Sequence, residues 1–150
     1  PLLFDVGQTV SIQDRLRAED TVDGDITSSI RVSALDLSSV NTGVYTVAVQ
    51  VTNSMGDTAE LELPVVISES GKDRPAITLS SALVYAECDS VFDPLSYISS
   101  VTLPSGALAD MSKVTCQSDV DTSVPGNYRV IYTYTDSGVT GTTALAVAVK

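Results

Sequence analysis

GVYTVAVQVTNS (Gly43–Ser54) is the stretch that decides the fold, because it recurs 83 positions later as GNYRVIYTYTDS (Gly126–Ser137). Each copy opens on Gly-x-Tyr, continues as alternating apolar and polar residues, and ends on an Asx-Ser turn. Alternation with a period of two is typical of a β-strand that buries one of its faces. A repeat of this kind in a chain of 150 residues predicts two similar all-β units in tandem.

The alternation assigns a buried face to each long strand, because successive side chains of a strand point to opposite sides. The opposite face of the first copy is mostly Thr, Ala and Gln, which is the pattern of a sheet with one face in the core and one in water. The side chains expected in the core are Tyr45, Val47, Val49 and Val51 in the first copy, and Tyr128, Val130, Tyr132 and Tyr134 in the second.

A second alternating strand follows each copy, at Leu61–Ile67 and at Leu145–Val149. Pro64 has no amide hydrogen to donate, so its strand is predicted at a sheet edge. No segment of ten or more residues keeps a helical period, and Leu95–Ser100 is expected to form a helical turn at most. Shorter strands are predicted at Val6–Ile12, Ile30–Ala34, Ile77–Tyr85, Tyr97–Leu103 and Lys113–Gln117.

Turn residues between these strands predict an all-β fold with an antiparallel β-sandwich in each half. The expected organisation is one domain at residues 1–70, a linker at 71–75 and a second domain at 76–150. Because the linker is short, we expect the two domains to lie end to end with restricted bending. Two such domains would span roughly 70 Å.

The net charge of −11 is unevenly distributed and argues against two classes of partner. Residues 1–71 hold 11 acidic and 3 basic side chains, and residues 72–150 hold 8 and 5. An acidic surface without a basic stripe repels phosphate backbones, so nucleic acid is not expected as a partner. No apolar run approaches the length of a membrane-spanning helix, so direct membrane insertion is not expected. A chain that begins at Pro1 is expected to be a processed chain or a piece of a longer one.

Asp20, Asp23 and Asp25, with Glu19 beside them, form the densest group of carboxylates. Oxygen ligands on a Gly-containing turn suit Ca²⁺, with Glu69 or Asp73 of the linker as a further ligand if the domains dock. The spacing is not that of an EF-hand, and the same residues also suit a tight turn closed by Asx hydrogen bonds. Both interpretations stay open from the sequence, and no other cofactor is predicted.

Cys88 and Cys116 both lie in the second half. They would form a disulfide if the protein works in an oxidising compartment. The alternative is a pair of free thiols that pack as small apolar side chains.

Tyr45 and Tyr128 each follow a glycine at the start of a strand. We expect their rings in the core and their hydroxyls bonded to the backbone across a corner. Tyr85 and Tyr97 are then the tyrosines left to contact a ligand, and the chain has no Trp for an aromatic sugar platform.

Catalysis is not predicted, because the chain contains no histidine. A Ser-His or Cys-His nucleophile is therefore excluded, and the commonest general base is missing. The carboxylates sit on solvated turns, where nothing is expected to raise the pKa of one above another. We therefore predict that this chain is not an enzyme.

The motifs of the first half resemble the bacterial immunoglobulin-like repeats of exported surface proteins. They are the acidic turn at Asp20–Ile30, the Gly43-x-Tyr45 start of a strand and its end at Thr52–Gly56. The second half is similar to the same repeats through Phe92–Leu95, Val120–Thr122, Pro125–Tyr128 and Tyr134–Ser137, but carries Leu103–Leu108 where the acidic turn would stand. The resemblance implies two tandem immunoglobulin-like β-sandwiches and an extracellular or cell-surface location.

Such repeats imply a structural role, so the leading hypothesis is a non-catalytic spacer module of a larger surface or secreted protein. One alternative is an adhesion module that binds a glycan or a host protein through its loops or a strand edge. Another is self-association into a head-to-tail extracellular filament.

Overall fold

A computed structural model describes residues 1–8, 11–33 and 41–150, and the fold of these residues is all-β. Within the described ranges no helix is long and apolar enough to cross a membrane. Short 3₁₀ turns lie at Gln13–Arg15, Thr27–Ser29, Pro94–Tyr97 and Met111–Lys113. The strands of the first half are β1 (Leu2–Asp5), β2 (Glu19–Asp20), β3 (Gly24–Asp25), β4 (Arg31–Val32), β5 (Gly43–Thr52) and β6 (Thr58–Ser68). Those of the second half are β7 (Ala76–Leu79), β8 (Leu83–Ala86), β9 (Ile98–Thr102), β10 (Thr115–Ser118), β11 (Gly126–Asp136) and β12 (Val139–Val149).

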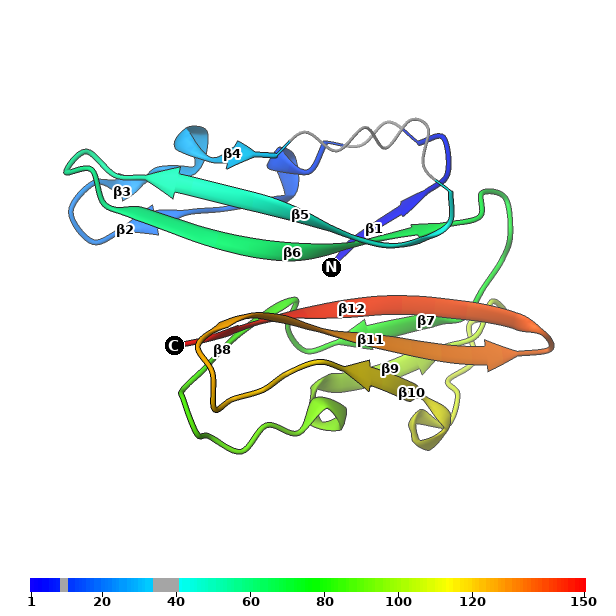
Figure 1. Cartoon of the computed structure of the whole chain (residues 1–150). Coiled ribbons are helices and arrows are strands. Elements are labelled where there is room, and N and C mark those ends of the chain that lie inside the picture. The colour runs from blue at the N-terminus through cyan, green and yellow to red at the C-terminus, as the bar shows by residue number, and fades with distance from the viewer. Residues whose placement is uncertain (9–10, 34–40) are drawn as a thin grey trace.

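The two halves build the same four-stranded sheet (Figure 1). The first has the strand order β1-β6-β5-β4, and the second has the order β8-β12-β11-β10. In each sheet the first strand runs parallel to the last long strand, while the other pairs are antiparallel. The long hairpins β5–β6 and β11–β12 are formed by the two copies of the repeated stretch and the strands that follow them. The repeat in the sequence is therefore a repeat in topology.

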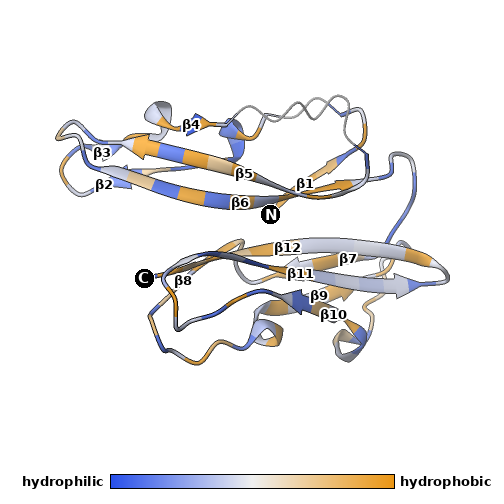
Figure 2. Ribbon diagram, viewed as in Figure 1, coloured by the Kyte–Doolittle hydropathy of each residue, from blue (hydrophilic) through white to orange (hydrophobic). Residues whose placement is uncertain are grey.

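Each sheet turns one face toward its own core, as the alternation predicts. Hydrophobic and hydrophilic residues alternate along β5 and β6 (Figure 2). Val47 and Val49 of β5 lie in the first core with Leu63 and Val65 of β6. In the second core Val130, Tyr132 and Tyr134 of β11 are buried, Tyr132 completely, while Tyr128 is half-buried and packs against the cluster. Val51 is the exception, because it is only half-buried and lies outside the first cluster. The predicted inward faces are confirmed apart from that position.

The two cores are closed differently on the side away from the long hairpin. In the second half β7 pairs with β9, and Ile77 and Val101 of this pair are buried in the second core. In the first half the core includes Ile12, with Leu16 packed against it, and these two residues flank the 3₁₀ turn Gln13–Arg15. A second sheet layer is therefore present opposite the hairpin of the second half.

Several shorter strands differ from the prediction. The first strand is Leu2–Asp5, and the predicted strand Val6–Ile12 is wrong, because Val6 and Gly7 form a turn; residues 9 and 10 lie outside the described part. The predicted strand Ile77–Tyr85 is two strands, since the chain leaves β7 and crosses to the other sheet to form β8. The strand predicted at Ile30–Ala34 is limited to β4, with Ala34 outside the described residues.

Pro64 does not lie on an edge strand, since β6 has β5 on one side and β1 on the other. Pairing with β1 begins at Val65, immediately after the proline. On the β5 side Pro64 stands opposite Thr46. The proline thus marks the point where β6 changes from an open side to a paired one, which explains why a missing donor is tolerated there.

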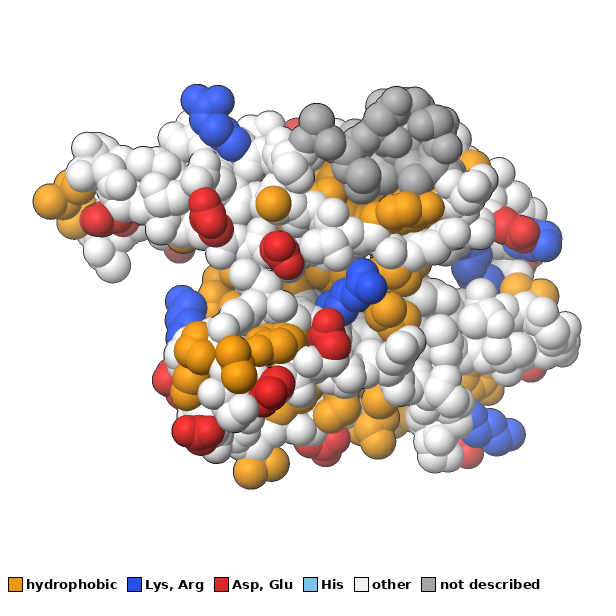
Figure 3. Space-filling model, in the orientation of Figure 1, with side chains coloured by type: hydrophobic (Ala, Val, Ile, Leu, Met, Phe, Trp, Pro, Cys, Tyr) orange, Lys and Arg blue, Asp and Glu red, His pale blue; other side chains and the backbone are white. Residues whose placement is uncertain are grey.

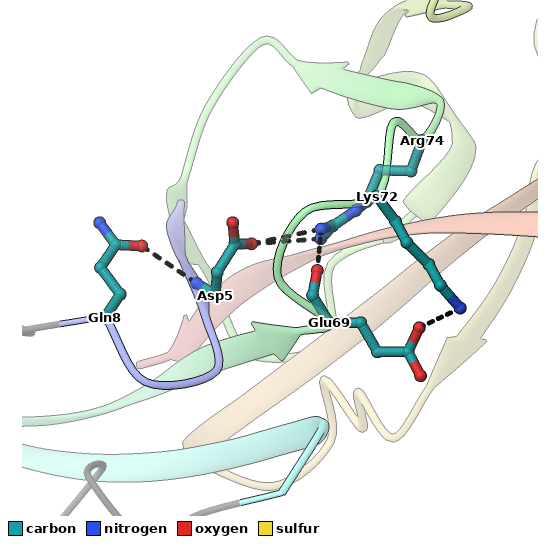
Figure 4. Close-up of polar contacts among 5 residues, drawn as sticks. All are labelled: Asp5, Gln8, Glu69, Lys72 and Arg74. Carbon is teal, nitrogen blue, oxygen red and sulfur yellow. Dashed lines mark hydrogen bonds and ion pairs between the residues drawn. The ribbon is translucent and has the colours of Figure 1, made fainter.

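The linker reverses the direction of the chain, so the halves lie side by side (Figure 1). Ser70 and Gly71 form the turn, and Gly71 has a φ of +73°, a conformation that glycine adopts without strain. Arg74 then returns to the first half, where its Nη2 lies 3.3 Å from Asp5 Oδ1 and also donates to the carbonyl of Glu69 (Figure 4). The predicted end-to-end arrangement is therefore wrong.

The halves dock through the outward faces of their sheets, with β6 against β12. On β12 the contact is a stripe of alanines, Ala144, Ala146 and Ala148, whose exposed fractions are 2%, 2% and 5%. On β6 it is Pro64 and Val66, both buried. Because alanine has the smallest side chain that still covers the backbone, this stripe allows the two sheets to approach closely.

Candidate functional site

The acidic turn of the first half is closed by its own carboxylates. Asp20 Oδ1 accepts hydrogen bonds from the backbone amides of Val22 at 2.8 Å and Asp23 at 3.0 Å. These amides, with the side chain of Asn53, hold the pKa of the Asp20 carboxyl below its ordinary value. This is the Asx-turn arrangement that the sequence left as one of its two interpretations.

The same turn is joined to the tip of the β5–β6 hairpin. Asn53 Nδ2 donates to Asp20 Oδ2 at 3.1 Å, while the amide and the hydroxyl of Ser54 donate to the Asp23 carboxylate at 2.7 and 2.6 Å. Asn53 Oδ1 in turn accepts from the amides of Met55 and Asp57, which orders the tip. The Asn-Ser end of the repeated stretch is therefore bonded to the acidic turn, some thirty residues earlier in the chain. The sequence does not predict this contact.

Asp25 lies opposite Glu19 across the β2–β3 pair and accepts from the amide of Thr27 at 2.9 Å. The Thr27 side chain and amide lower the pKa of the Asp25 carboxyl. Glu69, the linker carboxylate considered as a further ligand, forms an ion pair with Lys72 (Figure 4), at the end of the first half away from β2 and β3. Among the described residues, no three acidic or cysteine side chains are grouped so that they could hold a metal ion. Calcium binding by Asp20, Asp23 and Asp25 stays a prediction.

The two tyrosines that follow glycine occupy equivalent corners. Tyr45 donates its hydroxyl to the carbonyl of Asn41 at 2.8 Å, and Tyr128 donates to the carbonyl of Val124 at 2.9 Å. In each half the ring lies over the glycine two positions earlier, with ring atoms 3.6 Å from where a β-carbon would stand. The predicted corner, with the hydroxyl bonded to backbone, is confirmed for both.

The two cysteines are free and exposed, so the bridge between Cys88 and Cys116 is not formed. Cys116 lies on β10 at one edge of the second sheet, whereas Cys88 follows β8 at the other edge. Three strand spacings separate these edges, roughly 14 Å, and a disulfide needs α-carbons about 6 Å apart. The sequence could not supply this reason, because it depends on which strands neighbour one another.

The sequence does not predict the junction at which the two halves dock side by side. Arg129 of β11 donates from Nη1 to Thr46 Oγ1 of β5 at 3.3 Å, across the junction. Ala146 belongs to the buried cluster of the first half, so that core continues into the second half. Beside these contacts is an open cleft of about 450 Å³, whose apolar lining includes Leu2, Leu16, Leu63 and Leu83.

Exposed apolar side chains occur near the chain end of the second half, and Figure 3 shows apolar groups on the surface of that half. Val91 is 99% exposed, and Val124 is 51% exposed in a neighbouring loop. The two loops are tied by the Asp89 amide, which donates to the carbonyl of Thr122 at 2.8 Å. Of the tyrosines left for ligand contact, Tyr97 stacks on Phe92, while Tyr85 is exposed beneath the Lys150 ammonium.

No known protein-family profile matches the chain. A pesticidal crystal protein of Bacillus thuringiensis, Cry22Aa, is 36% identical over 126 residues, which is 81% of this chain and 16% of that protein. An uncharacterised 81.3 kDa protein of Acholeplasma phage L2 is 29% identical over 137 residues, which is 89% of this chain and 18% of that protein. The chain therefore spans about one sixth of the length of these curated relatives.

Among solved structures, ZmpB of Clostridium perfringens, determined as its M60 catalytic domain with two CBM51 domains, aligns with 99% of this chain and 30% of its own. The TM-score is 0.43 and the sequence identity 12%. At these values the likeness establishes neither a shared fold nor a shared activity.

Proposed function

We propose that this chain is a non-catalytic structural module of a larger, exported bacterial protein, made of two tandem immunoglobulin-like β-sandwich units at residues 1–70 and 76–150. Its role is to hold neighbouring segments of that protein in a fixed relative position at the cell surface or outside the cell. It does so as a rigid side-by-side pair rather than as an extended rod.

The observation that carries this proposal is the burial of outward-facing residues on β6 and β12, one strand of each long hairpin. The alanine stripe of β12 and the Pro64–Val66 face of β6 leave little room for the halves to slide or bend. Arg74 adds a polar tie between the linker and β1. Two units fixed in this way keep the segments attached to them at a constant distance and orientation.

Two further points support a module of a larger protein. Similar segments occupy about one sixth of two much longer proteins, one of them a pesticidal crystal protein. The absence of histidine from the sequence removes the commonest catalytic base, and the acidic turn uses its carboxylates to bind the chain's own donors. The resemblance to repeats of exported surface proteins supports the extracellular location.

The proposal is tested by replacing the segment in its full-length protein. Substitution by a flexible Gly/Ser linker of the same length should preserve export but impair the activity of the neighbouring segments, because the fixed geometry is lost. Substitution by the matching segment of Cry22Aa is the matched control and should restore that activity. Full activity with the flexible linker would show that no fixed spacing is needed.

A second candidate is a binding module for a glycan or another protein. It is favoured by Val91 and Val124, which present apolar surface on two connected loops away from both cores. A glycan array and a pull-down with the wild-type chain and a Val91→Ser, Val124→Ser variant would test it. Binding that disappears in the variant supports this role, and no binding by the wild type contradicts it.

A further inference from the structure

The docking face pairs equivalent positions of the two repeats. Leu2 stands beside Val65 in the first sheet, and Val84 stands beside Val147 in the second, so β6 and β12 correspond with an offset of 82 residues. Tyr45 opposite Val65 and Tyr128 opposite Val147 give β5 and β11 an offset of 83. By this correspondence Pro64 matches Ala146 and Val66 matches Ala148, and all four are buried at the junction.

The polar contact across the junction also joins equivalent positions of the two repeats. Arg129 donates to Thr46, and these residues are 83 positions apart, which makes them equivalent positions of β11 and β5. A contact between a residue and its own counterpart is the mark of an isologous interface, in which one surface patch meets the same patch of a related unit. β6 and β12 also run in opposite directions across the junction, as a two-fold axis perpendicular to these strands requires (Figure 1).

The patch is suited to a second acidic unit. Both halves are acidic, with net charges of −8 and −3 from the acidic and basic residues counted over 1–71 and 72–150. The buried positions that meet at the centre are proline, valine and alanine, so no like charges are brought together there. Arg129 supplies a cation at the margin, in a cleft that Glu62 and Asp119 also line.

Only the turn in the linker decides that the two patches of one chain meet each other. Residues Glu69 to Pro75 reverse the chain (Figure 4). The short linker gives the second half a high effective concentration near the first half of the same chain, so the intrachain pair is favoured at ordinary protein concentrations. Nothing in the patch itself distinguishes the second half of the same chain from the second half of another copy.

We propose that this face is an interaction surface for a second copy of the chain, which it binds by exchanging halves. The first half of each chain docks on the second half of its partner through Pro64, Val66 and the alanine stripe. Two chains with opened linkers close into a two-fold dimer that contains both interfaces. The monomer and the dimer thus use the same contacts.

The test prevents the turn in the full chain. Deletion of Gly71 and Lys72, or Gly71→Pro, removes the positive φ that the turn requires. Light scattering after size exclusion should then give twice the 15.7 kDa mass of the chain, and circular dichroism should show unchanged strand content. If the deletion variant does not fold, Gly71→Pro and refolding of the unaltered chain at high concentration give the same readout.

A second substitution distinguishes a dimer formed by exchange of halves from a dimer formed through another surface. Ala146→Glu in the linker-deleted chain places a carboxylate in the centre of the interface and should return the mass to that of a monomer with an extended scattering profile. Val91→Glu, at a fully exposed position, is the matched control and should leave the dimer intact. Folded linker variants that stay monomeric, form open polymers, or remain dimeric with Ala146→Glu would overturn the proposal.

Discussion

Gly141 of β12 lies against the backbone of Pro75, so closely that a β-carbon at position 141 would stand 1.9 Å from the Pro75 carbonyl oxygen. The contact is between two backbones, so no side chain can rotate away to make room. Pro75 ends the linker, and Gly141 lies near the start of the strand that carries the alanine stripe. The crossing of linker and strand is therefore possible only because residue 141 has no side chain.

Gly141→Ala should destabilise the protein by about 1–3 kcal/mol, since the backbone must shift to accept the methyl group. Chemical denaturation measures this loss. Gly126→Ala is the control, because the atoms nearest to a β-carbon there belong to the Tyr128 side chain and lie 3.6–3.7 Å away, an ordinary contact distance. Equal stability of the Gly141→Ala variant and the wild type would show that linker and strand do not cross this closely.

The sequence predicts the parts of the fold that depend on local periodicity. The period of two is clear over the long strands, so the sequence predicts which of their residues are buried. The structure buries Val47, Val49, Val130 and Tyr132 as expected. The sequence does not predict the first strand, since Leu2–Asp5 is short and pairs in parallel with a strand some sixty residues away. Short strands carry little pattern, and their place is decided by distant partners.

The arrangement of the halves could not be predicted in the same way. Ala144, Ala146 and Ala148 are compatible with a solvent-exposed face, and only the docked structure shows them buried. The reversal at Gly71 depends on a single positive φ, which a polar linker permits but does not require. For the acidic turn, the residue types indicate an Asx turn, but nothing in the sequence indicates its hydrogen-bond partners Asn53 and Ser54.

Thr143→Val should stabilise the protein by about 1 kcal/mol. Thr143 is 1% exposed, and its hydroxyl has no hydrogen-bond partner among the described residues. Valine keeps the shape of the side chain and removes the unsatisfied polar group. Thr133→Val is the matched control, because the Thr133 hydroxyl is bonded to that of Thr115 at 2.6 Å and its loss should not stabilise. A lower denaturation midpoint for Thr143→Val would mean that this hydroxyl is satisfied.

Tyr45→Phe should lower the free energy of unfolding by about 1 kcal/mol, because the bond to the Asn41 carbonyl is lost while the ring is kept. Tyr128→Phe should shift the denaturation midpoint in the same direction through the Val124 carbonyl. Tyr85→Phe serves as the control, since no hydrogen bond of its hydroxyl is found in the described structure. If all three variants unfold together with the wild type, the corners contribute nothing to stability.

Both thiols should be accessible in the folded protein, since Cys88 and Cys116 are free and exposed. Under non-denaturing conditions a maleimide reagent should label two sites per chain, and reduction should leave the intact mass of the monomer unchanged. Cys88→Ser and Cys116→Ser each remove one labelled site. A chain that labels only after reduction would carry a disulfide and would require a different strand arrangement.

Acid should weaken the hydrogen bonds that the Asp20 carboxylate accepts within the acidic turn and from the hairpin tip. The pKa of the Asp20 carboxyl is lowered in the fold, first by the amides of Asp23 and Val22 and then by Asn53. A lowered folded-state pKa contributes stability that is complete above the unfolded value, about 3.9, and is lost as pH falls through the folded value. Asp20→Asn keeps an acceptor for the amides but cannot titrate, so its melting temperature should fall less than that of the wild type on acidification below about pH 4. Carbon-13 NMR of the Asp20 carboxyl gives the direct measurement, and a titration midpoint at or above the ordinary aspartate value would show that the amides do not stabilise the carboxylate.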